Sequence, residues 1–149
     1  MKLLLVCSPG GHLAQISALR GWWGQHDRVW VTFDSPDVRA RLSQERVIHG
    51  HSPTTRNIPN LVRNERLARR VLREEKPDLV FSTGAGLAIP FFLHARRLGI
   101  RTAYLEVVDR IDSPTVTGLT VYPTTDLFLT QWSEQNRFYP GAHTIGPVL

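Results

Sequence analysis

The stretch that decides the fold is residues 2–12, KLLLVCSPGGH. Its first half is a short, continuous apolar run, which is typical of a parallel strand buried on both faces. Its second half is a glycine turn, and residues 12–22 then place apolar side chains at helical spacing. The stretch therefore predicts a strand that turns through glycines into a helix, the opening unit of an α/β domain.

The same alternation of strand and helix continues along the chain. Strand signals fall at Lys2–Ser8, Arg28–Phe33, Val47–Ile48, Asp78–Ser82, Arg101–Leu105, Asp126–Thr130 and His143–Ile145. Helix signals fall at His12–Trp22, Pro36–Gln44, Leu61–Glu75, Leu87–Leu98 and Ser133–Tyr139. This rhythm predicts one Rossmann-like, doubly wound parallel sheet over residues 1–149, without internal repeats or linkers.

The composition indicates what kind of protein this is and which kinds of partner it favours. A chain of 149 residues that is 42% hydrophobic suits one domain with a real core. Its net charge of +5 comes almost entirely from arginine and favours anionic partners such as phosphates, nucleotides or acidic lipids. No recognition motif accompanies the arginines, so we expect no nucleic-acid partner. The single cysteine, Cys7, excludes an internal disulfide and predicts a buried, inert thiol.

The apolar start of the chain is too short for a signal peptide. No stretch approaches the ~20 apolar residues that a membrane span needs. We therefore expect a protein of the reducing cytosol, with any membrane contact peripheral or through a partner. Trp22 and Trp23 follow an amphipathic helix signal and are the candidate membrane contacts, although packing against the sheet explains them equally well.

Ligands of open parallel sheets bind at the carboxyl ends of the strands, so the residues that follow each strand are site candidates. The first strand is followed by Gly10 and Gly11, which let the backbone approach a phosphate. The fourth is followed by a second glycine turn, made of Thr83, Gly84, Ala85 and Gly86. Neither turn is a dinucleotide fingerprint or a Walker loop, which argues against ordinary NAD and P-loop chemistry. Tight packing is the alternative reason for both turns.

Two titratable side chains at this edge could act as a general base. His12 begins the helix after the first glycine turn, and Glu106 leaves the strand that ends at Leu105. The simpler explanations are a local hydrogen bond for His12 and a solvated loop charge for Glu106. Arg56, in a polar loop, and Arg110 could bind an anion or could simply be surface arginines.

Taken in order, these segments resemble a known family. It is the acceptor-side, membrane-recruiting subunit of the bipartite N-acetylglucosaminyltransferase of dolichol-linked oligosaccharide synthesis, and the resemblance is closer to its bacterial exopolysaccharide and capsule counterparts. The matching segments are Ser8–His12, the loop around Arg56, Ser82–Gly86 with Pro90, Tyr104–Glu106 with Arg110, Leu119–Pro123, Asp126 and Thr130–Trp132. Each segment is weak alone, whereas the ordered set is fairly specific.

The resemblance implies the N-terminal, acceptor-binding half of a GT-B glycosyltransferase that is divided between two polypeptides. A separate chain is then expected to bind the donor, a UDP-sugar held at the shared interface, and the acceptor is a polyprenyl-diphosphate-linked glycan. By similarity to the single-chain N-acetylglucosamine transferase of peptidoglycan synthesis, His12 is the base candidate and Gly84–Gly86 hold the acceptor diphosphate. Glu106 is the competing candidate for the base, and Arg56 and Arg110 are expected to help bind the diphosphate.

The resemblance also implies a location and a chemistry. The eukaryotic subunit begins with a membrane-spanning segment, whereas this sequence opens on its first strand, so we expect a bacterial-type subunit at the inner face of the plasma membrane. No Asp-x-Asp motif occurs, since Asp109 and Asp112 are three apart, so we expect no metal and no cofactor. Two rival hypotheses remain: a self-sufficient nucleotide-binding enzyme, and a non-catalytic scaffold that recruits the donor subunit.

Overall fold

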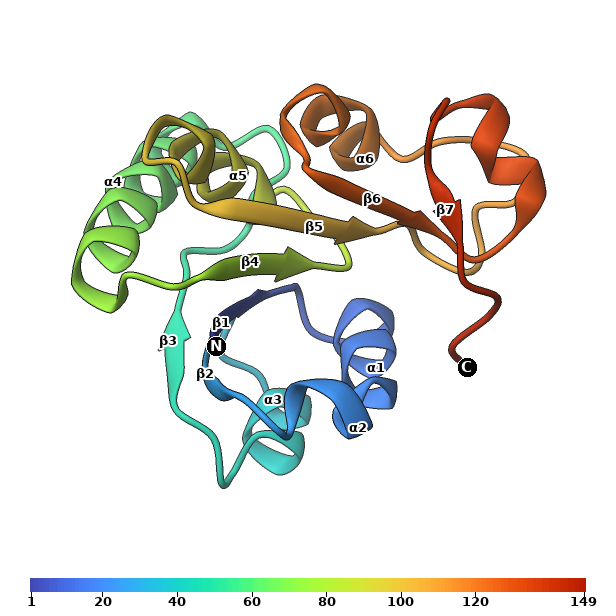
Figure 1. Ribbon diagram of the computed structural model, residues 1–149. Helices are drawn as coiled ribbons and strands as arrows, with labels where there is room; N and C mark the ends of the chain where they lie inside the picture. Colours follow the sequence, from blue (N-terminus) through green and yellow to red (C-terminus); the bar gives the residue numbers. More distant parts are fainter.

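The computed structural model describes residues 1–149 and contains one sheet of seven strands (Figure 1). The strands are β1 Lys2–Val6, β2 Asp27–Thr32, β3 Val47–His49, β4 Leu79–Ser82, β5 Arg101–Leu105, β6 Leu127–Thr130 and β7 His143–Thr144. The helices are α1 Gly11–Ala18, α2 Arg20–Trp23, α3 Pro36–Arg41, α4 Ile58–Glu75, α5 Ala88–Arg97 and α6 Val116–Val121, with the 3₁₀ helices η1 Tyr122–Thr124 and η2 Ser133–Arg137. All neighbouring strands are parallel, which confirms the predicted Rossmann-like sheet.

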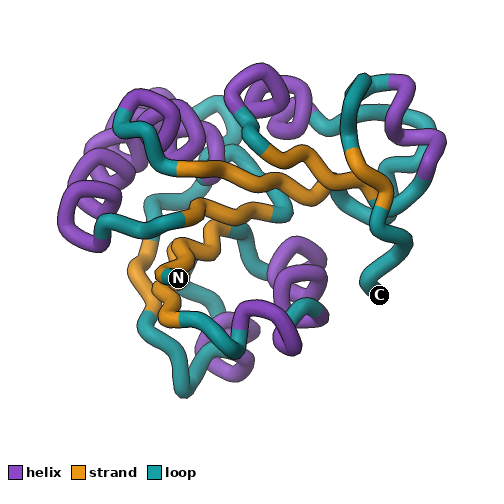
Figure 2. The backbone as a smooth tube through the Cα atoms, viewed as in Figure 1, coloured by secondary structure: helices purple, strands orange, loops and turns teal.

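Helices cover both faces of the sheet (Figure 2). Helices α4, α5 and α6 lie on one face, and α1, α2 and α3 lie on the other. Leu4 and Val6 pack into the core under α4 and α5, whereas Leu3 and Leu5 pack into the core under α1, because successive side chains of a strand point to opposite faces. All four side chains are fully buried, which accounts for the unbroken apolar run of β1.

The chain reverses its direction across the sheet at β1. The strand order is β3-β2-β1-β4-β5-β6-β7, so the chain first adds β2 and β3 on one side of β1 and then crosses to β4 on the other. In open parallel sheets, ligands bind outside the carboxyl ends of the strands at such a switch point. The turns that leave β1 and β4 therefore flank the expected site.

Several element boundaries differ from the sequence prediction. Helix α4 begins three residues before the predicted Leu61, because the side chain of Asn57 caps it by accepting a hydrogen bond from the Asn60 amide at 3.0 Å. The predicted helix 12–22 is divided at Leu19 into α1 and α2. The last helix signal forms the short 3₁₀ helix η2, and α6 has no counterpart in the prediction.

The thiol of Cys7 is buried between the sheet and α1, as predicted. Burial is the main cause that raises its pKa to about 12. Because the reactive species is the thiolate, a thiol with that pKa is inert at neutral pH.

Candidate functional site

Two turns meet at the carboxyl ends of β1 and β4. In the first, Gly10 has φ +82° and its amide donates to the Asp37 carboxylate at 3.1 Å. In the second, Gly84 has φ +122° and Ala85 has φ +79°, which is unusual for a residue with a side chain. Both turns lead into helices, α1 and α5, whose first backbone N–H groups point toward this edge. The Gly84 amide is already paired, since it donates to the Ser82 hydroxyl at 2.9 Å.

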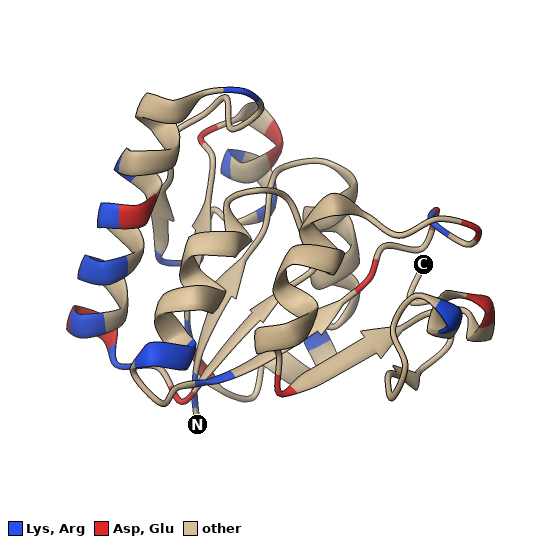
Figure 3. Cartoon of the chain, turned by 90° about the horizontal axis from the view of Figure 1, so that it is seen from above, with Lys and Arg blue, Asp and Glu red and all other residues tan.

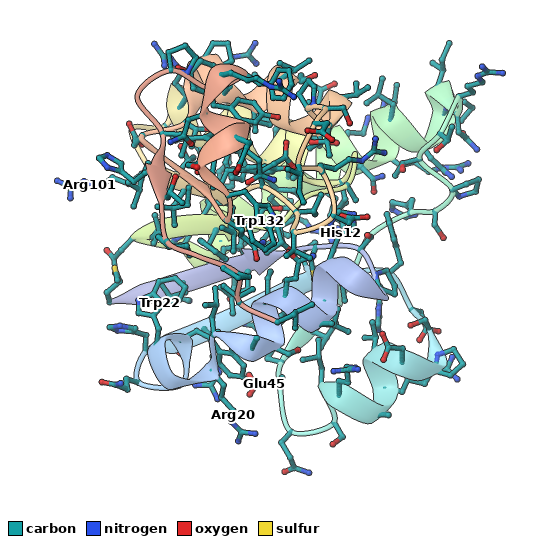
Figure 4. The ribbon with its side chains drawn as sticks, turned by 90° about the vertical axis from the view of Figure 1, so that its right-hand side faces the viewer. His12, Arg20, Trp22, Glu45, Arg101 and Trp132 are labelled. Carbon is teal, nitrogen blue, oxygen red and sulfur yellow. The ribbon has the colours of Figure 1, made fainter.

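His12 joins the two turns. Its ring Nδ1 lies 2.8 Å from the carbonyl oxygen of Thr83, and the Thr83 hydroxyl donates to the His12 carbonyl at 2.7 Å. A carbonyl oxygen can only accept, so this contact assigns the proton of a neutral ring to Nδ1 and leaves Nε2 as a free acceptor. The half-exposed ring lies where α1 begins (Figure 4). This is the arrangement that a general base requires.

The face of Gly84 is closed by two side chains. A Cβ atom added there would lie 2.9 Å from Cε1 of His12 and 2.9 Å from the hydroxyl oxygen of Tyr104. Tyr104 is fully buried, and its hydroxyl has no hydrogen-bond partner within the chain. Burial raises the pKa of Tyr104, so the hydroxyl keeps its proton. The sequence analysis did not single out Tyr104 as a site residue, although it lies two residues before Glu106 on the same strand end.

We expect Gly84→Ala to strain the backbone and to push His12 or Tyr104 out of place. The variant should lose about 1–3 kcal/mol of unfolding free energy, the usual cost of an overpacked site. It should also move the NMR signals of the His12 ring. Gly99→Ala is the matched control, because Gly99 also has positive φ, +71°, but nothing lies within 4 Å of its added Cβ. Equal stability and unchanged His12 signals in the two variants would contradict this packing.

Glu106 is wholly buried and its carboxylate is fully engaged. It accepts hydrogen bonds from the backbone amide of Val107 at 3.0 Å, from the amide and hydroxyl of Thr115 at 3.2 Å and 2.9 Å, and from the hydroxyl of Tyr139. Burial and this last hydrogen bond raise the pKa of Tyr139. The structure therefore contradicts the prediction of Glu106 as a competing base, since a carboxylate closed off from solvent does not meet a substrate hydroxyl. It fixes the loop that leads into α6.

Buried amides that the sequence analysis missed hold the same region. The side chain of Gln131 donates to the Glu106 carbonyl at 2.9 Å and to Oε1 of Gln15 at 2.6 Å. That Gln15 oxygen also accepts from the Val108 amide at 3.1 Å. Gln131 follows strand β6 at its carboxyl end, a position that could have signalled it. These contacts fasten the loop after β5 to helix α1, beside His12.

The two predicted anion-binding arginines are both exposed. Arg56 makes no side-chain hydrogen bond within the chain, and the loop that carries it reaches the second glycine turn, since Thr54 Oγ1 lies 3.3 Å from the ideal Cβ position of Gly86. Arg110 donates weakly to Ser113 at 3.5 Å. The structure thus brings the Arg56 loop to the turn, and Arg110 stays on its own loop with a free guanidinium edge.

Only one tryptophan of the predicted membrane pair keeps exposed surface. Trp23 is only 4% exposed, donates its indole N–H to the Ile16 carbonyl at 2.8 Å and packs edge-on against Trp30. Trp22 is half-buried and packs edge-on against Phe81 of the sheet. The prediction is wrong for Trp23, because helical apolar spacing marks burial against a sheet as readily as burial in a lipid. No helix has both the length and the apolar character of a membrane span.

A homology search relates the whole chain to one kind of protein. The human and mouse proteins named UDP-N-acetylglucosamine transferase subunit ALG14 are 22% and 23% identical to it, over 100% of this chain and 83% of each relative. Its homologues are ALG14 subunits. The similarity to these subunits confirms the family resemblance that the sequence suggested. No protein-family model matches the chain.

Solved structures support the fold class. MurG from Acinetobacter baumannii superposes with a TM-score of 0.76 over 97% of this chain at 17% identity. The UDP-GlcNAc 2-epimerase of Methanocaldococcus jannaschii, solved with UDP-GlcNAc and UDP, gives 0.73 over 93% at 15% identity. The chain spans 44% and 42% of the lengths of these two proteins. At such identities the likeness establishes the fold alone, and it confirms the predicted Rossmann-like fold class.

Proposed function

We propose that this chain is the acceptor-binding subunit of a two-chain glycosyltransferase of polysaccharide biosynthesis. Residues 1–149 act as a single acceptor-binding domain, and a separate subunit binds the nucleotide-sugar donor. The donor is a UDP-sugar held at the shared interface, and the acceptor is a polyprenyl-diphosphate-linked glycan. The names of the ALG14 homologues support a transferase subunit, and the GT-B-like fold supports a site between two such halves.

The two glycine turns are suited to the acceptor diphosphate. The backbone amides of Gly10, Gly11 and the segment Thr83–Gly86 lie at the starts of α1 and α5, where helix N-termini favour negative charge. Arg56 supplies an exposed positive charge from the loop that touches the second turn, and Arg110 supplies one from the loop after β5. Together they hold a diphosphate mainly through the other amides of the turns, because the Gly10 amide already donates to the Asp37 carboxylate at 3.1 Å and the Gly84 amide to the Ser82 hydroxyl at 2.9 Å.

His12 takes the proton in the proposed reaction. The acceptor hydroxyl oxygen forms a bond to the anomeric carbon of the donor sugar, and the bond from that carbon to the diphosphate oxygen breaks. UDP leaves with the bonding electrons, and the hydroxyl proton moves to Nε2 of His12. The hydrogen bond from Nδ1 to the Thr83 carbonyl is the observation that carries this role, because it holds Nε2 free and steadies the imidazolium that forms.

Because the proposed acceptor is attached to a polyprenyl lipid, the reaction takes place at a membrane surface. We propose that the subunit works peripherally at the inner face of the plasma membrane, where its net charge of +5 favours anionic lipid. The self-sufficient enzyme and the scaffold remain as rival hypotheses. A non-catalytic scaffold would need neither a free ring nitrogen on His12 nor backbone amides placed to bind a diphosphate.

Binding of the acceptor to the isolated chain tests this proposal. A water-soluble polyprenyl-diphosphate glycan with a short lipid should shift the amide signals of Gly11, His12 and Gly84 saturably in NMR. The same glycan without its diphosphate should bind at least about tenfold more weakly, since charge-assisted hydrogen bonds are lost. Shifts confined to other parts of the chain, or equal affinity for both compounds, would overturn the proposed acceptor role.

A further inference from the structure

A second basic hollow lies away from the His12 turns. It measures about 350 Å³ and lies between helix α4 and the loop that follows β3. The hollow is lined by His51, Arg63, Arg66, Leu67 and Arg70. Helix α4 carries five arginines, more than any other helix, visible as blue bands along the helix on the left of Figure 3. No acidic side chain lines the hollow.

The three guanidinium groups share one face of α4. Arg63, Arg66 and Arg70 are spaced by three and four residues, which are neighbouring positions on a helix surface. None of them forms an ion pair, and Arg63 donates only to the side-chain oxygen of Asn60 at 2.8 Å. Like charges at such spacing repel one another. All three side chains are exposed, and an anion bound among them would offset this repulsion.

The carboxylates of α4 do not neutralise this cluster. Glu65 pairs with Arg69 at 3.2 Å and with His94 of α5 at 3.4 Å. Glu75, at the other end of the helix, pairs with Arg46 and with Lys2. Glu65 thus serves Arg69 of the same helix, and Glu75 serves other elements. Glu74, four residues after Arg70, forms no ion pair with it, so none of the three carboxylates of α4 pairs with an arginine of the hollow.

The wall of the hollow is held in place by a buried amide. Asn64, which is 2% exposed, accepts a hydrogen bond from the His51 amide at 2.8 Å and donates to the His51 carbonyl at 2.9 Å. Leu67, which is 5% exposed, closes the base. His51 is thereby fixed against α4, so the loop and the helix present one preformed surface.

We propose that this hollow binds a phosphate group. Guanidinium groups match phosphate oxygens with paired N–H donors, and several of them around one pocket favour an anion with more than one charge. Two sources share this chemistry: the headgroup of an anionic phospholipid, and a soluble phosphate or diphosphate. The lining of the hollow shares no residue with the two glycine turns or with His12, although His51 lies in the same loop as Arg56.

Binding of inorganic pyrophosphate to the isolated chain tests the site, measured by calorimetry at low salt. The variant is Arg66→Gln/Arg70→Gln. The control is Arg20→Gln/Arg101→Gln, which removes the same two charges from exposed positions on other elements (Figure 4). We expect the first variant to weaken pyrophosphate binding at least about tenfold and the control to change it less than about twofold. Equal weakening in the two variants would overturn the site, because diffuse charge would then explain the binding.

Vesicles identify the source of the phosphate. Wild type and both variants are sedimented with vesicles of phosphatidylcholine alone and of phosphatidylcholine with phosphatidylglycerol. If only Arg66→Gln/Arg70→Gln loses binding to the anionic vesicles, the ligand is a lipid headgroup. If both variants sediment like wild type while pyrophosphate binding still depends on the hollow, the ligand is a soluble phosphate. The proposal is rejected if the hollow affects neither. None of these assays needs sugar transfer. Pyrophosphate that binds at the His12 turns is present equally in both variants, so only the component of binding that Arg66→Gln/Arg70→Gln removes and the control keeps reports on the hollow.

Discussion

Replacement of His12 by alanine is expected to lower sugar transfer by the assembled two-chain enzyme about 10²- to 10⁴-fold, the usual contribution of a positioned general base. In a neutral ring Nε2 is the acceptor, because the Thr83 carbonyl takes the hydrogen bond from Nδ1–H. The variant should fold and should bind its partner subunit, because the half-exposed ring is not part of either core. Steady-state transfer with a saturating donor, and circular dichroism of the purified chain, measure both effects.

His12→Asn separates proton transfer from positioning. An asparagine amide can still donate toward the Thr83 carbonyl, but it cannot take a proton from a hydroxyl. We expect His12→Asn to be as inactive as His12→Ala. Recovery of activity in His12→Asn would assign His12 a purely structural role.

Glu106→Gln is the competing variant. Because the Glu106 carboxylate is buried and hydrogen-bonded to Thr115 and Tyr139, we expect it to lower thermal stability more than turnover of the folded fraction. If Glu106→Gln abolished turnover while His12→Ala cost only a few-fold, the two roles would be reversed. If both variants were silent in the complex, the chain would supply no base, and the scaffold hypothesis would replace ours.

The parallel sheet was predictable from sequence because its physical signal is local. A strand buried on both faces must be apolar at every position, as β1 is from Leu3 to Val6. The turns after β1 and β4 were also predictable, since glycine is the residue that adopts the positive φ found at Gly10 and Gly84. These features are why the sequence places the candidate site at the carboxyl edge of the sheet, between the turns after β1 and β4.

The incorrect predictions concern the burial of single residues by segments that are distant in the sequence. A local sequence pattern does not contain that information. Trp23 lies in an apolar stretch, but only the fold shows that the sheet covers it. The local sequence around Glu106 is typical of a solvated loop acid, but in the fold its carboxylate accepts a hydrogen bond from Tyr139, which lies far along the chain. Gly84, His12 and Tyr104 come from three separate segments of the chain. The sequence could indicate that individual residues belong to the site, but it could not predict that these three lie in contact.

The partner requirement is the second prediction with a large effect. We expect this chain alone to show no sugar transfer above background, because the proposed donor site belongs to another polypeptide. Mixing it with the donor-binding subunit should restore transfer, with a rate that saturates as the second chain is added. The homologues carry the word subunit in their names, and the chain covers 44% of the length of MurG.

The central claim is that one active site is divided between two chains. Its most direct test is a transfer assay with a UDP-sugar and a polyprenyl-diphosphate glycan, run with each purified chain alone and with the two mixed. We predict product only in the mixture, and loss of that product when this chain carries His12→Ala. Robust turnover by this chain alone, or by the donor-binding chain alone, would contradict the claim.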